Sequence, residues 1–274
     1  MKTVEKLYLE LLKDTLQFAL WPEPDVPVEL SNASRGGLLR FLVNSASKVL
    51  ALKKMKIVKA LEHSEKEVAE GRIWPRYADT MIGRKRLENI QYCVETVLSE
   101  GVVGDLIETG VWKGGACIFM RGILAAYGVG DRMVYVADSF QGLPEPNPDR
   151  FPADRESAWH SHGVLAISQA DVENNFRRYG LLDDQVVFLK GWFKDTLPIA
   201  PIERLAVLRL DGDMYESTID ALSWLYPKLS VGGFCIVDDY SLPECRQAVA
   251  DYRSANGITC EMVEIDWTGL YWRK

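Results

Sequence analysis

Aspartates follow two short apolar runs in the second half of the chain, at a spacing that could support metal chemistry. Asp211 follows the run 205–210, and Asp238 and Asp239 follow the run 234–237. Carboxylates that lie within a few ångströms of one another repel unless they are protonated or neutralised. A hard divalent cation such as Mg²⁺ removes that repulsion and still leaves positions for water or substrate. If the two runs are neighbouring strands, we expect a magnesium site here; the alternative is a set of unconnected turn residues.

A second group of residues could bind a nucleoside. The turn from Glu108 to Gly115 makes its tight bend at Gly110 but lacks the G-x-G-x-x-G spacing that lets a backbone approach a pyrophosphate. Asp138 ends the next apolar run, where a nucleotide-binding fold places a carboxylate for ribose hydroxyls. A carboxylate pair without phosphate-binding glycines suits a nucleoside whose other end is cationic and free of phosphate. S-adenosylmethionine meets that description.

Apolar strands alternate with helices from about residue 104 to the end of the chain. The expected strands are Asp105–Glu108, Met133–Asp138, Val186–Leu189, Leu205–Leu210, Phe234–Val237, Thr259–Ile265 and Gly269–Trp272. The expected helices are Met81–Leu98, Ala116–Tyr127, Ala170–Tyr179, Tyr215–Leu229 and Pro243–Ala255. This alternation is typical of βαβ units around a buried parallel sheet. Ligands of such sheets bind outside the carboxyl ends of the strands, which is where the aspartates would lie.

Composition and charge exclude several other classes of protein. With 274 residues, 47% hydrophobic and 26% charged, the chain is not disordered, collagen-like or a coiled coil. A net charge of −7 argues against a nucleic-acid partner. No apolar stretch approaches the roughly 20 residues of a membrane span, and residues 1–6 lack the features of a signal peptide. We therefore expect a cytoplasmic protein. Five cysteines without a C-x-x-C pair argue for reduced thiols and against a zinc site.

The segment from Arg35 to Leu61 has a different character from the rest. It carries seven basic residues and no acidic one, with apolar residues at helical spacing. A basic amphipathic helix of this kind can lie on an anionic membrane surface or dock on a partner. The interpretation that we favour is a solvated helix that packs on its own domain or across a subunit interface.

A polar loop is expected over the site between residues 151 and 164. This stretch is rich in Pro, Asp, Arg and His and lies between an expected strand and helix. His160 or His162 could contact substrate or share a proton, and the alternative is that both are solvent-exposed loop residues.

Six motifs, in order along the chain, are similar to those of a known family. They are Tyr77-Ala-Asp-Thr-Met-Ile-Gly-Arg-Lys-Arg-Leu-Glu-Asn89, Ile107-Glu-Thr-Gly-Val-Trp-Lys-Gly-Gly115, Ala137-Asp-Ser-Phe-Gln-Gly-Leu-Pro144, Gly191-Trp-Phe-Lys-Asp-Thr-Leu-Pro198, Leu210-Asp-Gly-Asp-Met-Tyr-Glu-Ser-Thr218 and Val231-Gly-Gly-Phe-Cys-Ile-Val-Asp-Asp-Tyr240. Together they resemble the macrocin O-methyltransferase family, whose members include enzymes that methylate sugar hydroxyls of macrolides and of novobiocin. The resemblance runs from about Trp74 to the C-terminus and is less clear over the first seventy residues.

The resemblance implies an α/β fold of the class I methyltransferase (Rossmann-like) type. Its seven-stranded, mostly parallel sheet would carry helices on both faces and occupy residues 74–274. Residues 1–73 would form an N-terminal helical extension that acts as a lid and as an oligomer segment, in a homodimer or a higher homo-oligomer.

The resemblance also implies S-adenosylmethionine and Mg²⁺ as cofactors, and it assigns residues to each. The cofactor-binding residues would be Thr80, Met81, Ile82, Glu108, Gly110, Asp138, Ser139, Trp192 and Phe193. Asp211, Asp238 and Asp239 would hold the metal, and Asp211 would also take the hydroxyl proton. Catechol-type O-methyltransferases resemble this chain in fold but place a lysine three residues after the first metal aspartate. That position is Met214 here, which favours a metal-bound diol over a lysine-assisted phenol.

The sequence therefore predicts an O-methyltransferase that acts on a sugar hydroxyl of a glycosylated natural product. Two alternatives stay open. The acceptor could be a phenol or another polyol, or the chain could be a non-catalytic membrane-surface or partner-binding protein organised by the basic segment.

Overall fold

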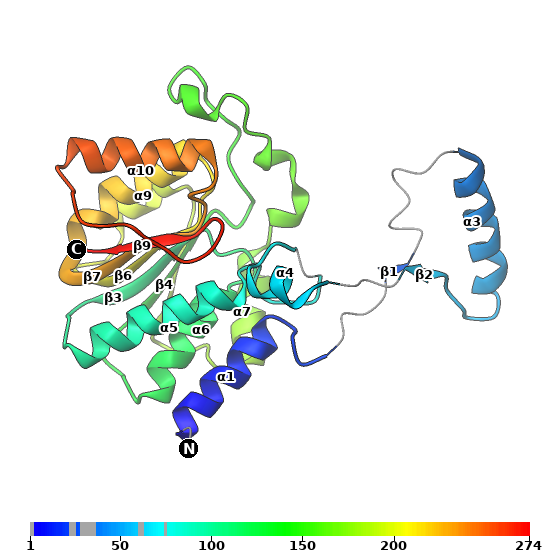
Figure 1. Ribbon diagram of the computed structural model, residues 1–274, viewed down its shortest axis with the longest axis horizontal. Coiled ribbons are helices and arrows are strands. Elements are labelled where there is room, and N and C mark those ends of the chain that lie inside the picture. The colour runs from blue at the N-terminus through cyan, green and yellow to red at the C-terminus, as the bar shows by residue number, and fades with distance from the viewer. Residues whose placement is uncertain (1–2, 22–25, 28–36, 60–62, 74–75) are drawn as a thin grey trace.

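A seven-stranded sheet forms the centre of the computed structural model, which describes residues 3–21, 26–27, 37–59, 63–73 and 76–274 (Figure 1). Its strands are β3 (Asp105–Thr109), β4 (Val134–Asp138), β5 (Val186–Lys190), β6 (Leu205–Leu210), β7 (Leu229–Val237), β8 (Val263–Glu264) and β9 (Leu270–Arg273). The spatial order is β5-β4-β3-β6-β7-β9-β8. The first five strands run parallel, whereas β9 pairs antiparallel with β7 and with β8. The predicted seven-stranded, mostly parallel sheet is confirmed.

Helices cover both faces of this sheet (Figure 1). They are α1 (Val4–Leu16), α5 (Arg84–Ser99), α6 (Gly115–Ala126) and α7 (Gln169–Arg178) on one face, and α8 (Phe193–Thr196), α9 (Tyr215–Leu225) and α10 (Pro243–Ala255) on the other. Successive side chains of a strand point to opposite faces of the sheet, so a strand can contribute side chains to the hydrophobic cluster on each face. Leu106 and Val136 join the first hydrophobic cluster, while Ile107 and Ala137 join the second. Because both faces are buried, the strands read as continuous apolar runs.

Helix α5 begins later than the sequence pattern indicates. The pattern predicts a helix from Met81, but the structure starts it at Arg84 with Gly83 as an extended N-cap. A Cβ added to Gly83 would lie 2.2 Å from the backbone nitrogen of Gly71, so the two glycines cross in close contact. This crossing leaves Thr80 to Ile82 outside the helix, as a segment that leads into it.

The N-terminal part of the chain divides into two unlike pieces. Helix α1 packs on α6 and buries its apolar side chains Leu9, Leu12 and Leu16 in the first core cluster. In contrast, α3 (Gly37–Ala51) and the short strands β1 (Val26–Pro27) and β2 (Val58–Lys59) lie away from the sheet (Figure 1).

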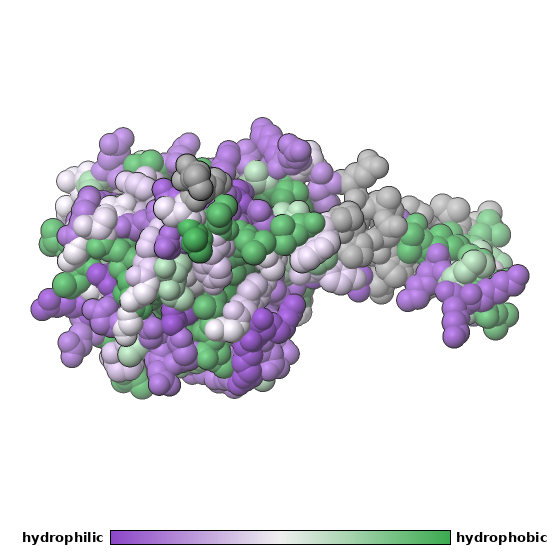
Figure 2. Space-filling view, turned by 90° about the horizontal axis from the view of Figure 1, so that it is seen from below, coloured by the Kyte–Doolittle hydropathy of each residue, from purple (hydrophilic) through white to green (hydrophobic). Residues whose placement is uncertain are grey.

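We call residues 37–59 the arm. Figure 2 shows it with apolar and charged residues together on the exposed surface, and Phe41, Val49 and Leu52 are exposed. Arg35, Leu61 and Trp74, which mark the limits of the basic segment and the start of the family motifs, lie outside the described residues. The 73/74 division, the lid and oligomer roles of residues 1–73 and the membrane-surface role of the basic segment 35–61 stay predictions. In the described ranges, no helix is long and apolar enough to cross a bilayer.

The ends of the parallel strands are held in register beyond the strands themselves. The backbone N–H of Asp211 donates to the carbonyl of Thr109 at 2.9 Å, and that of Asp238 donates to Leu210 at 2.8 Å. Gly110 sits between these chains with a φ of 88°, and a Cβ there would lie 1.7 Å from the carbonyl oxygen of Asp211. Only glycine allows this approach, which brings the turn after β3 against the turn after β6.

We expect Gly110→Ala to destabilise the fold far more than Gly128→Ala. Gly128 also has a positive φ (64°), but a Cβ there meets nothing within 4 Å. The Gly128 variant should lose only the left-handed backbone penalty of about 1–2 kcal/mol, which corresponds to a few degrees of Tm. The Gly110 variant adds a backbone clash, so its loss of Tm by calorimetry should be at least threefold larger. Equal losses would contradict the importance of the close approach.

Candidate active site

A cavity of about 440 Å³ opens at the carboxyl ends of the parallel strands. Every residue that the sequence assigns to a cofactor or a metal lines it, although they come from six separate stretches of the chain. These residues are Thr80, Met81, Ile82, Glu108, Gly110, Asp138, Ser139, Trp192, Phe193, Asp211, Asp238 and Asp239. The fold therefore brings together residues whose sequence positions span about 160 residues, and the parallel register described above is the reason.

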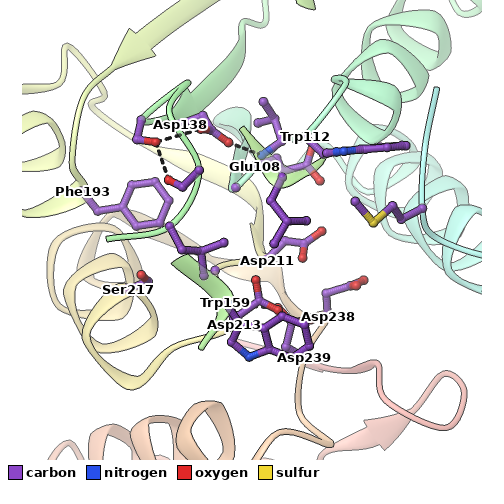
Figure 3. Close-up of a pocket in the computed structure, with 18 of the residues that line it drawn as sticks. Glu108, Trp112, Asp138, Trp159, Phe193, Asp211, Asp213, Ser217, Asp238 and Asp239 are labelled. Carbon is purple, nitrogen blue, oxygen red and sulfur yellow. Dashed lines mark hydrogen bonds between the residues drawn. The ribbon is translucent and has the colours of Figure 1, made fainter. Parts of the chain in front are cut away.

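Three carboxylates meet where β6 and β7 end (Figure 3). Oxygens of Asp211, Asp238 and Asp239 all lie within 4.8 Å of one another. Burial, reinforced by mutual repulsion, raises the pKa of Asp211 and raises that of Asp239 well above its usual range. A set of hard oxygen donors whose charges repel is the kind of site that Mg²⁺ fits.

A buried arginine ties this cluster to the end of β3. Arg209 has no exposed surface, and its guanidinium contacts carboxylates on three strand ends: Glu108, Asp211 at 2.6 Å, and Asp238. Its Nε has no partner among the described residues. Arg209 was not predicted from the sequence, although the signal was available. A charged residue within a strand that is apolar on both faces must find buried partners.

A second arginine, Arg86, reaches the same cluster from α5. It contacts the other oxygen of Asp238 and pairs with Asp266 at 2.9 Å, on the segment before β9. Asp238 is thus held from two sides by guanidinium groups. Because burial disfavours an unpaired charge, this arrangement fixes the orientation of Asp238 more firmly than those of the other two carboxylates.

Glu108 belongs to the same network. Burial raises its pKa to about 7, and Arg209 opposes that shift. The thiol of Cys117 on α6 donates to its second carboxylate oxygen at 2.9 Å. Glu108 therefore lines the cavity as part of a buried ion cluster.

Asp138 shapes the turn on the opposite side of the cavity. Its carboxylate accepts the backbone N–H group of Val111 at 2.8 Å (Figure 3). It also accepts the backbone N–H group of Phe140 at 2.6 Å. Burial raises the pKa of Asp138, while these hydrogen bonds lower it. The side chain joins the turns after β3 and β4 and keeps its place on the cavity wall.

The segment before α5 is fastened to the start of α6. Lys113 donates to the carbonyls of Arg76 at 3.1 Å and Ala78 at 2.7 Å. Asp79 accepts the hydroxyl of Tyr179 at 2.7 Å. These contacts place Thr80 to Ile82 as the cavity wall; the structure corrects the expectation that these residues lie on a helix.

A fourth carboxylate beside the aspartate cluster was missed from the sequence. Asp213 lines the cavity with a φ of 56°, and its backbone N–H donates to Asp239 at 3.1 Å. Burial and the charges of Asp211 and Asp238 raise its pKa to about 8. A bound cation would oppose that shift. Among the described residues, no ion pair is formed by the Asp213 carboxylate, in contrast to Asp211 and Asp238.

The two histidines are placed differently from the rest of the predicted site. His160 and His162 are exposed and are not among the residues that line the cavity. They lie between Trp159 and Leu165 in the loop between β4 and α7, and it is these two apolar residues that reach the cavity wall. The structure thus gives the loop a place over the site but turns its histidines outward.

The sheet order, the antiparallel β9 and a cavity at the carboxyl ends of the parallel strands define the class I methyltransferase fold. A family model described as Macrocin-O-methyltransferase (TylF) matches residues 5–274. The chain belongs to the macrocin O-methyltransferase family, as its motifs indicate, and it is an O-methyltransferase.

Known relatives agree with this assignment. The chain is 62% identical over 204 residues to the 8-demethyl-8-(2,3-dimethoxy-alpha-L-rhamnosyl)-tetracenomycin-C 4'-O-methyltransferase of Streptomyces olivaceus, covering 74% of this chain and 78% of that protein. It is 59% identical over 207 residues to the mycinamicin III 3''-O-methyltransferase of Micromonospora griseorubida, covering 74% and 82%. Among solved structures, the O-methyltransferase NovP is similar with a TM-score of 0.84 at 48% identity, covering 98% of this chain and 99% of that one.

We expect Arg209→Met to cost about 3–5 kcal/mol of unfolding free energy, because it leaves buried carboxylates without their partner. Arg177→Met, which breaks an exposed pair with Glu173 at 2.9 Å, should cost about 0.5 kcal/mol or less. Urea denaturation measures both.

The loss in the Arg209 variant should also depend on pH. Burial raises the pKa of Glu108 and of Asp211, and Arg209 opposes both shifts, so without the guanidinium these two carboxylates bind protons more tightly in the folded state than in the unfolded state. Stability then rises as pH falls, so the loss should be smaller at about pH 5.5 than at about pH 7.5. A loss that is the same at both values would show that these carboxylates are not what Arg209 neutralises.

Proposed function

We propose that this enzyme transfers a methyl group from S-adenosylmethionine to a sugar hydroxyl of a glycosylated natural product, with Mg²⁺ bound at the aspartate cluster. One observation carries the proposal: a single cavity joins a nucleoside-binding wall at Asp138 to the carboxylates of Asp211, Asp238 and Asp239. The named activities of the relatives support the choice of acceptor, because the compounds in those names include a rhamnosyl-tetracenomycin and mycinamicin III.

In this proposal the cofactor lies along the wall that runs from Thr80 to Phe193. Asp138 would accept the ribose hydroxyls while it keeps its backbone hydrogen bonds, since a carboxylate offers about four lone-pair sites. Trp192 and Phe193 would lie near the adenine, and Thr80 to Ile82 would cover the methionine end. Glu108 and Gly110 would shape the turn beneath it.

The aspartate cluster fits Mg²⁺ by its donor chemistry and by its excess of negative charge. When bound, the cation supplies Lewis acidity toward a substrate hydroxyl and a template for a vicinal diol. The protein's own part is orientation: Arg209 and Arg86 fix Asp238, and Arg209 also holds Asp211. Holding the acceptor oxygen about 3 Å from the methyl carbon, in line with the sulfonium, contributes much of the rate.

Two carboxylates compete for the role of general base. The sequence favours Asp211, which in the structure already accepts a hydrogen bond from Arg209. Asp213 lines the same cavity without an arginine contact among the described residues. A carboxylate that keeps its lone pairs for substrate is the better proton acceptor, so the geometry adds Asp213 as the candidate that an experiment must separate from Asp211.

Three further points belong to the proposal. We keep a cytoplasmic location and a homodimer or larger homo-oligomer, with residues 1–73 as its lid and oligomer segment. A phenolic or other polyol acceptor is the alternative that the acceptor assay below decides. A membrane-surface role of the arm would require binding to anionic vesicles.

Binding and turnover test the proposal together. By calorimetry, Asp138→Asn should weaken S-adenosylmethionine about tenfold or more, because a hydrogen bond to a charged group is lost, and leave Mg²⁺ binding unchanged. Asp239→Asn should weaken Mg²⁺ about tenfold or more, since it removes a charged oxygen donor, and leave the cofactor unaffected. Asp184→Asn, an exposed acid, serves as the matched control.

The loaded enzyme should then methylate mycinamicin III or the rhamnosyl-tetracenomycin compound faster than catechol. If catechol is preferred, the sugar acceptor is wrong, and if neither ligand binds the wild-type protein, the two-site interpretation fails.

Replacing Asp213 separates the two candidate bases. If Asp213 is the base, Asp213→Asn should lower kcat about 100-fold or more, as for loss of a general base, with the Mg²⁺ affinity within about threefold of wild type. A parallel loss of Mg²⁺ affinity would make Asp213 a metal ligand instead. An unchanged kcat would leave the role to Asp211.

A further inference from the structure

We propose that Trp159 is the surface against which the ring of the acceptor is held, and that Asp154 and Trp112 are positioning residues that fix the loop carrying it. This inference rests on the proposed function, because it concerns the acceptor half of the same cavity. It names a side chain that holds the acceptor ring, and it explains why the loop between β4 and α7 has a defined place over the site.

The first anchor of the loop is a buried carboxylate. Asp154 has no exposed surface, and it accepts the backbone N–H groups of Tyr215 at 2.7 Å and Glu216 at 3.0 Å. These are the first two residues of α9, whose N–H groups have no partner within the helix. Helix α9 directly follows the turn that bears Asp211 and Asp213. Asp154 therefore ties the loop to the turn that carries the catalytic carboxylates.

The second anchor lies on the cofactor side of the cavity. The indole nitrogen of Trp112 donates to the carbonyl of Val164 at 2.9 Å. Trp112 follows the turn at Gly110 and has a φ of 46°, so its backbone conformation is set by the tight bend after β3. The loop is thus fastened near one end to the start of α9, after the turn that bears Asp211 and Asp213, and near the other end to Trp112 in the turn after β3.

Trp159 lies between these two anchors and reaches the cavity. Its ring is only partly buried and lines the same cavity as the aspartate cluster (Figure 3). The ring of His162 lies against it, with 5.4 Å between the ring centroids. This contact lets His162 support the indole; a part in proton transfer, one of the two alternatives that the sequence leaves open, stays a prediction. A fixed indole between two anchored ends offers a rigid surface at a small entropic cost.

The chemistry of the cavity matches a ring with one polar edge and one apolar face. The carboxylates would take the hydroxyl edge, and the electron-rich face of an indole attracts the weakly positive C–H bonds of a sugar ring. A planar phenol would also lie flat on an indole. The assignment of Trp159 therefore holds for either acceptor class, and it can be tested with whichever one the wild-type enzyme methylates.

Kinetics with matched tryptophan variants test the surface. With mycinamicin III, the rhamnosyl-tetracenomycin compound and catechol as probes, Trp159→Ala should raise the acceptor KM at least tenfold. The Kd for S-adenosylmethionine should stay within twofold, and Trp159→Phe should restore KM to within about threefold. Trp224→Ala, on the exposed side of α9 and outside the cavity lining, is the control. A KM within twofold of wild type, or an equal loss of cofactor affinity, overturns the assignment.

Hydrogen exchange tests the anchor without any acceptor. In Asp154→Ala, the amides of Tyr215 and Glu216 and those of Ser157 and His162 in the loop should exchange at least tenfold faster than in wild type. Glu156→Ala, an exposed acid two residues away, should leave them unchanged. Wild-type exchange in the Asp154 variant overturns the anchor. Methylation of catechol alone would overturn the sugar acceptor while Trp159 is still tested.

Discussion

The arrangement of the active site depends on the ion pairs that the guanidinium of Arg209 forms with carboxylates. Arg209 belongs to β6, a strand that is buried on both of its faces, and its guanidinium contacts carboxylates at the ends of β3, β6 and β7. Without it, the buried Glu108 and Asp238 and the partly buried Asp211 would repel one another, and their charges would be left unpaired in a low-dielectric environment. With it, the ends of three strands are joined electrostatically as well as by backbone hydrogen bonds. The carboxylates can then face the cavity in fixed orientations, and one of them, Asp238, is held a second time by Arg86.

A charge cluster of this kind requires a backbone that brings strand ends together, and the turn after β3 supplies it. Gly110 lets that turn touch the carbonyl of Asp211, while Asp138 gathers the N–H groups of Val111 and Phe140. The cavity wall at Asp138 and the aspartate cluster are therefore connected through the turn after β3, which contacts both. This continuity brings the predicted cofactor residues and the predicted metal ligands to one cavity without an extra domain between them.

Much of this arrangement was predictable, because it depends on patterns that the chain shows locally. Alternating apolar strands and helices predicted the parallel sheet, and carboxylates after apolar runs predicted which residues line the cavity. Arg209, Arg86 and Asp213 were missed because their importance depends on partners far away in the sequence. The predicted start of α5 was wrong because the close crossing of Gly71 and Gly83 is a tertiary contact, which the helical spacing of apolar residues does not reveal.

The position of the loop between β4 and α7 also depends on a contact that is distant in the sequence. Its composition leaves two alternatives for His160 and His162: a part in the chemistry, because imidazole is the usual group that titrates near neutral pH, or exposure to solvent. Its position depends instead on Asp154, whose pKa is raised by burial and lowered by the α9 N–H groups that it accepts. Once that carboxylate is committed to the start of α9, the next turn of the loop carries Trp159 to the cavity and leaves His160 and His162 in solvent. One buried acid thus determines which face of the loop meets the substrate.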